Sequence, residues 1–371
     1  MRRYLENLTL IGLFGYFFLV PWGLSAQQLR LGFDQSEYLE ALKVSAYIVE
    51  DSAYTSKIPP PEVFSKSYRS GTVGLDNVWE MWEHKDDPIA LISIRGTTIN
   101  AVSWLENLYA AMVPAQGELH LEREFTFAYD LSSNPKAAIH VGWLIGMAYL
   151  YRDIEPKISE AHKNGINDFL IVGHSQGGGI AYLLTAHLRS LQAAGKLPGD
   201  IRFKTYCSAA PKPGNLYFAY SYEDPRFKGW AYNVVNAKDW VPEVPMSIQT
   251  TDDFNTLNPF ANAKQVISKQ RFPKNIALRR VYNQLDKPAK TARRNYRKYL
   301  GDFASKAVAK QLPELEVPVY FMSNHYVRTG EIIVLLPDDA YVNDYPDDPK
   351  QPFMHHYHIP YIRLALQLPT P

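Results

Sequence analysis

The sequence predicts an α/β fold in which helices cover both faces of a mainly parallel sheet. Apolar runs of strand length alternate along the chain with longer segments of helical period. Such alternation is typical of parallel sheets, since each pair of parallel strands needs a crossover that is usually a helix. The run of residues 89–94 is apolar throughout, as expected for a strand buried on both faces. A chain of 371 residues can bury a substantial core.

The elements follow in order along the chain. Residues 37–57 have an approximate helical period, and Pro59-Pro60-Pro61 ends that segment. Further helices are expected at 144–162, from 178 to about 194 and near 362–366, and strands at 78–82, 89–94, 169–172, 203–208 and 231–235. Residues 319–336 are strand-like.

The N-terminus has the pattern of a signal peptide, which we expect to cover residues 1–26. Two arginines precede an apolar run at residues 8–20, and Leu24-Ser25-Ala26 is a suitable cleavage site. The run is shorter than the roughly 20 residues that a membrane span needs, and an uncleaved anchor is the alternative reading. Cys207 is the only cysteine, so no intrachain disulfide is possible, and we expect it to be a small buried residue. An exported chain without disulfides indicates a secreted or periplasmic protein of a bacterial envelope.

The turn at Gly173-His174-Ser175-Gln176-Gly177 predicts a nucleophilic serine. It joins an apolar strand to a helix, which is the context that a G-x-S-x-G nucleophile elbow requires. We expect side chains at the two outer glycines to collide with the neighbouring strand or helix. The turn leaves Ser175 at the helix N-terminus, where free backbone N–H groups can bind an oxyanion. An idle serine in a glycine-rich turn is the alternative.

A serine nucleophile needs a histidine base and an acid, which follow the serine in the order acid, histidine in α/β-hydrolases. Asp239 follows the apolar run of the 231–235 strand in a short polar loop, which places its carboxylate at the same sheet edge as the elbow. Asp252 and Asp253 are less well placed. Asp239 is therefore the expected acid, with a turn or capping role as the alternative.

Four histidines follow Asp239, at positions 325, 355, 356 and 358. His325 lies in the strand-like stretch and is expected to be packed there. The other three lie just before the closing helix, where a catalytic base fits, and physical reasoning does not separate them. No acidic or cysteine spacing around the three supports a metal site, and the expected chemistry needs no cofactor.

One segment differs from the rest in charge. Residues 264–310 hold fourteen Lys or Arg and only two acids, a charge of +12 in a chain of net +1. The segment is helical in character, and a solvated helical insertion is its simplest interpretation. A contact with an anionic membrane or lipid interface is the functional alternative. Export argues against nucleic acid as a partner, and no obligate protein partner is expected.

Several sequence blocks, in the correct order, resemble the class 3 lipases, the family that includes the fungal triacylglycerol lipases. The blocks are Ile94-Arg95-Gly96-Thr97-Thr98 followed by Trp104, Ile139 to Leu144, the elbow, Ala209 to Asn215, Asn236 to Pro245, and His358-Ile359-Pro360-Tyr361. The last block resembles the family's "HxxY". Thr97 could otherwise only finish a turn, and Trp104 could be an ordinary core aromatic.

The resemblance implies an α/β-hydrolase with Ser175 as nucleophile, Asp239 as acid and His358 as base. It implies an oxyanion hole formed by the backbone N–H groups of Thr97 and Gln176, with possible help from the Thr97 hydroxyl. Residues 27–371 would form a single domain with helical insertions at about 105–138 and 258–314. These two segments are longer than the corresponding segments of the compact fungal enzymes.

The predicted function is an exported carboxylic ester hydrolase that acts on lipids, as a triacylglycerol or phospholipid lipase. Two alternatives stay open: a short-chain esterase or thioesterase, and a non-catalytic envelope-binding protein that keeps the hydrolase scaffold.

Overall fold

A computed structural model describes residues 29–369; the expected signal peptide at residues 1–26 lies outside them. A seven-stranded sheet forms the centre of the fold, in the order β1-β2-β3-β8-β9-β11-β13. These strands are Phe64–Arg69, Trp79–His84, Ile89–Ile94, Asp168–His174, Arg202–Ser208, Ala231–Asn236 and Glu331–Leu335. The five strands from β3 to β13 in this order are parallel to one another. Strand β2 is antiparallel to both of its neighbours, β1 and β3. The predicted α/β-hydrolase fold, with a mainly parallel sheet, is confirmed.

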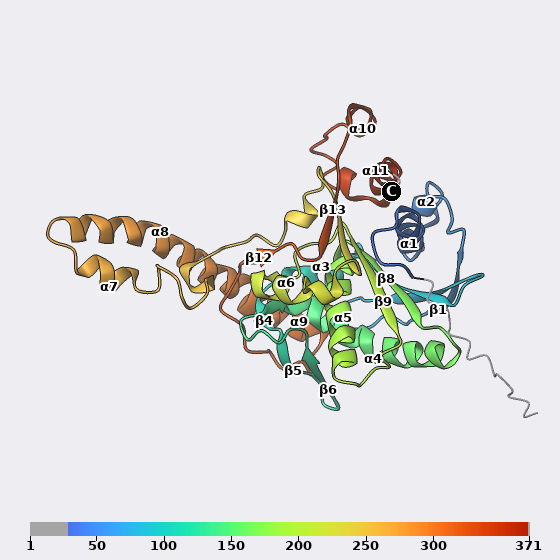
Figure 1. Ribbon diagram of the computed structural model, residues 1–371, viewed down its shortest axis with the longest axis horizontal. Helices are drawn as coiled ribbons and strands as arrows, with labels where there is room; N and C mark the ends of the chain where they lie inside the picture. The colour runs from blue at the N-terminus through green and yellow to red at the C-terminus, as the bar shows by residue number, and fades with distance from the viewer. Residues whose placement is uncertain (1–28, 370–371) are drawn as a thin grey trace, which may run out of the picture.

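Helices cover both faces of this sheet (Figure 1). On one face, α4 (Val141–Lys163) and α5 (Gln176–Ala193) pack against alternate residues of β3, including Ile92 and Ile94. On the other face, α1 (Gln35–Tyr47) and α11 (His358–Ala365) pack against Leu91 and against Leu170 of β8. Because both faces are buried, every residue of β3 is apolar or small, as the sequence predicted.

The remaining elements lie outside these layers. A four-stranded sheet has the order β12-β10-β7-β4, and β5 pairs with β6 in a hairpin. These strands are Tyr326–Val327, Gly214–Asn215, Ala138–His140, Met112–Pro114, Gln116–Glu122 and Phe125–Asp130. The short helices are α2 (Ser52–Thr55), α3 (Ala101–Leu108), α6 (Leu216–Tyr222) and α10 (Asp339–Asp344). Residues 105–138 were expected to be a helical insertion, but strands β4, β5 and β6 lie between residues 112 and 130 of this segment.

The basic segment is helical, as expected. It contains α7 (Ala263–Ser268), α8 (Lys274–Arg297), a π-helical stretch at Lys298–Phe303 and α9 (Ala304–Gln311). Figure 1 shows α7 and most of α8 extending away from the body as an arm, whereas α9 lies against the body. Among residues 29–369, no helix is long and apolar enough to cross a membrane.

Candidate active site

Ser175 lies on a strained turn between β8 and α5. Its φ and ψ are 59° and −129°, a backbone conformation that a residue other than glycine rarely adopts. A Cβ on Gly173 would lie 2.1 Å from the carbonyl oxygen of Gly177, and one on Gly177 would lie 2.2 Å from that of Ile94. The expected collisions with the helix and with strand β3 are therefore present. The close approach holds the serine at the carboxyl edge of the sheet.

Asp239 and a histidine form a buried hydrogen-bonded pair beside this turn. The Asp239 carboxylate follows β11 and is almost fully buried. Its Oδ2 lies 2.8 Å from Nδ1 of His356, and its Oδ1 accepts from the backbone N–H of Val241 at 3.0 Å. Since a carboxylate only accepts, Nδ1 of His356 carries the proton in this pair. That arrangement leaves Nε2 of His356 as the free ring nitrogen.

Tyr361 makes a second side-chain contact with the acid. Its hydroxyl donates to Oδ2 of Asp239 at 2.7 Å and accepts from the backbone N–H of Asn236 at 3.1 Å. Burial raises the pKa of Tyr361 well above its usual value, so the hydroxyl stays protonated as a donor. The tyrosine of the "HxxY" block therefore lies at the acid, although its histidine does not.

His358 was the expected partner of Asp239, and its contacts correct that expectation. Its Nδ1 lies 2.7 Å from the hydroxyl of Tyr54, and its Nε2 lies 3.3 Å from Oγ of Ser45. Burial lowers the pKa of His358 to about 3. The ring begins α11 and is turned toward α1 and α2, because the backbone N–H of His358 also donates to Tyr54 at 3.1 Å. His356, two residues earlier, is the histidine that meets Asp239.

The other two candidate histidines lie elsewhere. His355 contacts Tyr341 through Nδ1 and Asp347 through Nε2, at 2.8 and 2.9 Å. His325 precedes the short strand β12, and partial burial lowers its pKa. Within residues 29–369, no group of three or more His, Cys, Asp or Glu is arranged to hold a metal ion.

His174, the residue before the nucleophile, connects the elbow to the histidine loop. Its Nε2 donates to the carbonyl oxygen of His356 at 2.6 Å, because a carbonyl can only accept. Its Nδ1 then accepts from the hydroxyl of Ser208 at 3.1 Å. The ring also stacks on His358 with the centroids 4.0 Å apart. Burial, with smaller contributions from His358 and His356, lowers the pKa of His174 well below its usual value, so it stays neutral.

Thr97 and Gln176 hydrogen-bond to each other next to the nucleophile Ser175. The Thr97 hydroxyl donates to Oε1 of Gln176 at 2.9 Å, and Nδ2 of Asn107 donates to both residues at 2.9 and 2.8 Å. The indole N–H of Trp143 donates in turn to Asn107 at 2.9 Å. As the first residue of α5, Gln176 has a backbone N–H with no carbonyl of a preceding helical turn to accept it.

The buried carboxyl group of Glu106 lies next to this hydrogen-bond network. Nδ2 of Asn77 donates to Oε2 of Glu106 at 2.6 Å. Burial is the largest effect on Glu106 and raises its pKa to about 8, despite opposing hydrogen bonds from Asn77 and Gln176. Sequence reasoning missed Glu106 and Asn107, since neither follows a chemical motif; only the packing of α3 against α4 brings them to the elbow.

One cavity contains the reactive groups. It has a volume of about 510 Å³, and its lining includes Ser175, Thr97, His356 and His358. Much of the rest of its wall is apolar, from Val49, Ile99, Trp104, Phe353 and Tyr357. The side chains of Ile99 and Trp104 are 100% and 41% exposed, so the rim presents apolar surface to solvent.

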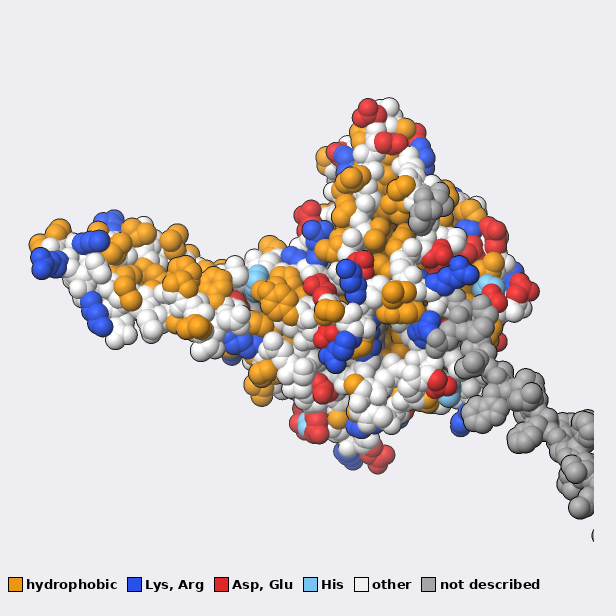
Figure 2. All heavy atoms as spheres, viewed as in Figure 1, with side chains coloured by type: hydrophobic (Ala, Val, Ile, Leu, Met, Phe, Trp, Pro, Cys, Tyr) orange, Lys and Arg blue, Asp and Glu red, His pale blue; other side chains and the backbone are white. Residues whose placement is uncertain are grey.

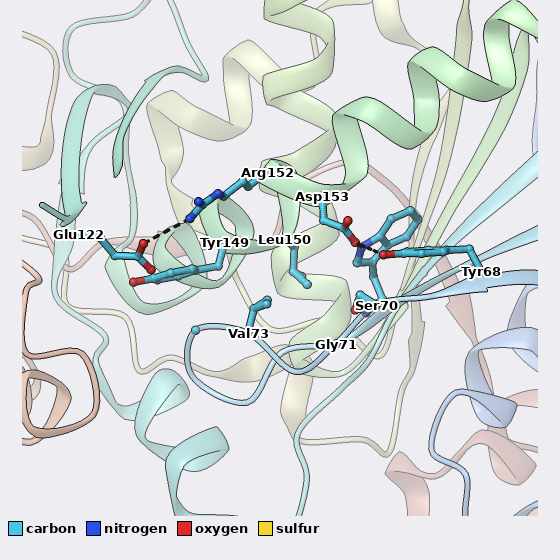
Figure 3. A pocket seen from close by; sticks show the side chains of 11 residues that line it. Tyr68, Ser70, Gly71, Val73, Glu122, Tyr149, Leu150, Arg152 and Asp153 are labelled. Atoms are coloured by element: carbon cyan, nitrogen blue, oxygen red, sulfur yellow. Dashed lines mark hydrogen bonds and ion pairs between the residues drawn. The ribbon is translucent and has the colours of Figure 1, made fainter. Parts of the chain in front are cut away.

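A second cavity, of about 480 Å³, lies between β1, β2 and α4 and holds no such combination. Figure 3 shows its polar groups paired with one another: Tyr68 points to Asp153, and Arg152 points to Glu122. The hydrogen bond from Tyr68 to Asp153 is 2.8 Å long, and the ion pair is 3.3 Å. The first cavity is therefore the candidate active site.

One protein family matches part of the chain. The family Lipase (class 3) matches residues 91–248, which include the elbow and Asp239. The match agrees with the expected class 3 lipase resemblance and with a carboxylic ester hydrolase. A search of curated proteins gave no match.

Several solved structures of fungal lipases are similar to parts of the chain. A Rhizomucor miehei lipase propeptide complex is 19% identical over 58% of this chain and 66% of its own, just under two thirds, with a TM-score of 0.41. Rhizomucor miehei triacylglyceride lipase is 19% identical over 58% of this chain and 77% of its own, with a TM-score of 0.42. Lip2 lipase from Yarrowia lipolytica is 16% identical over 59% of this chain and 77% of its own, with a TM-score of 0.42.

Proposed function

We propose that the protein hydrolyses carboxylic esters of lipids with Ser175 as nucleophile, a proposal supported by the match of residues 91–248 to the family Lipase (class 3). One observation carries the proposal. Ser175, on a strained turn, lines the same cavity as His356, whose Nδ1 is held by Asp239 at 2.8 Å. A nucleophile, a base and an orienting acid in this order are the components of a serine hydrolase triad.

His356 is the proposed base, in place of His358. Nε2 of His356 takes the Ser175 proton as Oγ bonds to the ester carbonyl carbon, and the carbonyl oxygen becomes an oxyanion. The carbon–alkoxy bond then breaks, and the leaving alcohol takes the proton from Nε2. Water adds to the acyl-enzyme in the same way and releases the fatty acid and free Ser175. Asp239 keeps the His356 proton on Nδ1 throughout and stabilises the imidazolium.

The backbone N–H groups of Thr97 and Gln176 are the proposed donors to the oxyanion. The hydrogen bonds of the Thr97 hydroxyl with Gln176 and Asn107 support a positioning role for that hydroxyl rather than direct donation. Donors that are held in place before the reaction stabilise the developing charge without reorganisation. His174 and Tyr361 are proposed positioning residues, because they hold the His356 backbone and the Asp239 carboxylate.

The apolar wall of the cavity supports an acyl chain as part of the substrate. Ile99, Trp104 and Tyr357 line the cavity and are substantially exposed, which favours esters with long hydrocarbon groups over short polar ones. The substrate class is therefore acylglycerols or phospholipids. We further propose that residues 1–26 direct export, to the exterior or the periplasm. Residues 27–371 would form one domain with insertions at 105–138 and 258–314.

A fluorophosphonate probe tests the mechanism, since it labels only an activated serine. The wild-type chain should be labelled on Ser175, and Ser175→Ala should lose both the label and roughly a millionfold in kcat. Hydrolysis of emulsified triglyceride should exceed that of soluble short-chain esters. No labelling of a folded chain in detergent would favour a non-catalytic protein, and a strict preference for short soluble esters would favour an esterase.

A further inference from the structure

The arm, which we define as residues 258–297, is the largest feature that the proposed chemistry does not use. It consists of α7, α8 and the turn between them, and it projects from one side of the body (Figure 1). Helices α7 and α8 pack on each other. Figure 2 shows basic and apolar side chains close together along its surface.

The C-terminal half of α8, from Asp286 onward, is fastened to the body. Arg293 donates to Oδ2 of Asp252 at 2.8 Å and to Oγ1 of Thr250 at 3.0 Å. Lys290 pairs with Asp252 and with Asp286 of its own helix, at 3.1 and 3.2 Å. These contacts hold the base of the arm at a defined place. The outer part of α8, from Lys274 to Leu285, extends beyond this fastening.

The arm also carries a group of exposed cations. Over the residues that the structure describes, no ion pair involves Lys274, Arg279, Arg280 or Lys287, and all four are exposed. Arg279, Arg280 and Lys287 line a shallow hollow of about 450 Å³ along α8. Unpaired cations held this close together repel one another, and an anionic surface would relieve that repulsion.

A row of exposed apolar side chains runs along another side of α8. Leu278, Val281 and Leu285 are spaced i, i+3 and i+7, so they share one face of the helix. Their side chains are 37%, 56% and 73% exposed. Phe272, two residues before α8, is 79% exposed. Arg280 and Lys287 share a different face by the same spacing rule. Apolar residues on one face and cations on the other are typical of helices that lie in a membrane interface.

We propose that the arm binds the surface of a lipid bilayer that contains anionic headgroups. The apolar row would enter the boundary between headgroups and acyl chains, and the cations would contact the phosphates of neighbouring lipids. Cations alone would suit nucleic acid equally well, but nucleic acid leaves the exposed Leu278, Val281 and Leu285 without a role. A bilayer uses both features at once. This inference does not depend on ester hydrolysis.

Co-sedimentation with vesicles of non-hydrolysable ether lipids tests the proposal. The full chain with Ser175→Ala serves as the protein, so that the outcome is independent of the proposed chemistry. Binding is expected to vesicles that contain phosphatidylglycerol, to weaken strongly in vesicles of phosphatidylcholine alone, and to fall as NaCl rises.

Two sets of variants separate the contributions of charge and apolar contact. The triple variant Arg279→Gln, Arg280→Gln, Lys287→Gln should weaken partitioning about a hundredfold, at about fivefold for each charge removed. Leu285→Ala should weaken it roughly tenfold. The matched controls are Lys163→Gln, Lys196→Gln, Lys228→Gln on the body, and Leu336→Ala, whose side chain is 74% exposed. Both controls should bind as the parent does.

The proposal is overturned if the arm variants bind vesicles as tightly as the body controls. It is equally overturned if the folded chain does not bind anionic vesicles but binds an acidic protein or a DNA duplex through Arg279, Arg280 and Lys287. Loss of esterase activity alone would bear on the proposed function and leave this inference intact.

Discussion

The turn at residues 173–177 and the loop at residues 354–361 both contribute to one cavity, but different forces determine them. Backbone collisions at Gly173 and Gly177 force the turn, so its five residues contain nearly all the information about its shape. The loop has three histidines in four positions, and tertiary hydrogen bonds determine the role of each. Asp239 hydrogen-bonds to His356, whereas Tyr54 and Ser45 hydrogen-bond to His358. A site residue that depends on local backbone geometry can be identified from sequence; one that depends on distant partners needs the fold.

A large loss of activity is expected when the acceptor that orients the loop histidine His356 is removed. Asp239→Asn keeps the size of the side chain but offers an N–H where His356 needs a carboxylate, which favours the wrong tautomer of the ring. We expect kcat on a soluble ester to fall about ten-thousandfold with little change in KM. The conversion Asp252→Asn, near the base of the arm, is the control and should leave kcat near the wild-type value. Near-normal activity of Asp239→Asn would remove Asp239 from the mechanism.

The turn should be broken by a single methyl group. Gly177→Ala would place a Cβ 2.2 Å from the carbonyl oxygen of Ile94, so β3 or α5 must shift. We expect the free energy of unfolding to fall by about 3 kcal/mol, measured by urea denaturation. Gly199→Ala is the matched control, since nothing lies within 4 Å of its Cβ, and it should change stability by less than about 0.5 kcal/mol. Equal stabilities of the two variants would contradict a turn determined by collision.

The carboxyl beneath the turn predicts a pH dependence. Burial raises the pKa of Glu106 from its ordinary value of 4.5 to about 8, so the folded state holds a proton there that the unfolded state releases. Stability from this group is present below the unfolded pKa and declines as pH rises toward 8, by about 1.4 kcal/mol per pH unit. Glu106→Gln should remove that decline in urea midpoints measured between pH 5 and pH 8. An unchanged slope in the variant would show that Glu106 is not the titrating group.

The smallest expected effect concerns the second donor to the acid. Tyr361→Phe removes the hydroxyl that lies 2.7 Å from Asp239, and we expect kcat to fall about tenfold while KM stays nearly constant. Tyr341→Phe is the control, because that hydroxyl meets Asn236 and His355 and makes no hydrogen bond with Asp239. If both variants lost activity equally, the contribution of Tyr361 would be general packing rather than positioning of the acid.

The sequence was sufficient for the central strands of the sheet and for the helix that follows the turn, but β1 (Phe64–Arg69) was not predicted. The runs at 89–94, 169–172, 203–208 and 231–235 are all strands, because continuous apolar runs of that length suit a sheet buried on both faces. Residues 37–57 were predicted as one helix, and the structure divides them into α1 and α2 with Asp51 capping the second. Cys207 is buried, as expected.

The support around the site could not be predicted in the same way. Glu106 and Asn107 lie on α3, and neither has a spacing that signals a role; their contacts with Asn77 and Gln176 arise only when α3 packs beside the elbow. The hydrogen bond from His174 to the carbonyl oxygen of His356 joins residues 182 positions apart. Long-range partners of this kind leave no periodic pattern in a sequence.

The central claim is that His356, rather than His358, is the base paired with Asp239. The direct test measures kcat/KM on one soluble ester for His356→Gln and His358→Gln, with circular dichroism to verify folding. We expect a loss of roughly a millionfold for His356→Gln. We expect a loss of no more than about tenfold for His358→Gln, since its ring hydrogen-bonds to Tyr54 and Ser45, stacks on His174 and, among residues 29–369, makes no hydrogen bond with Asp239. A large loss for His358→Gln with near-normal activity of His356→Gln would contradict it.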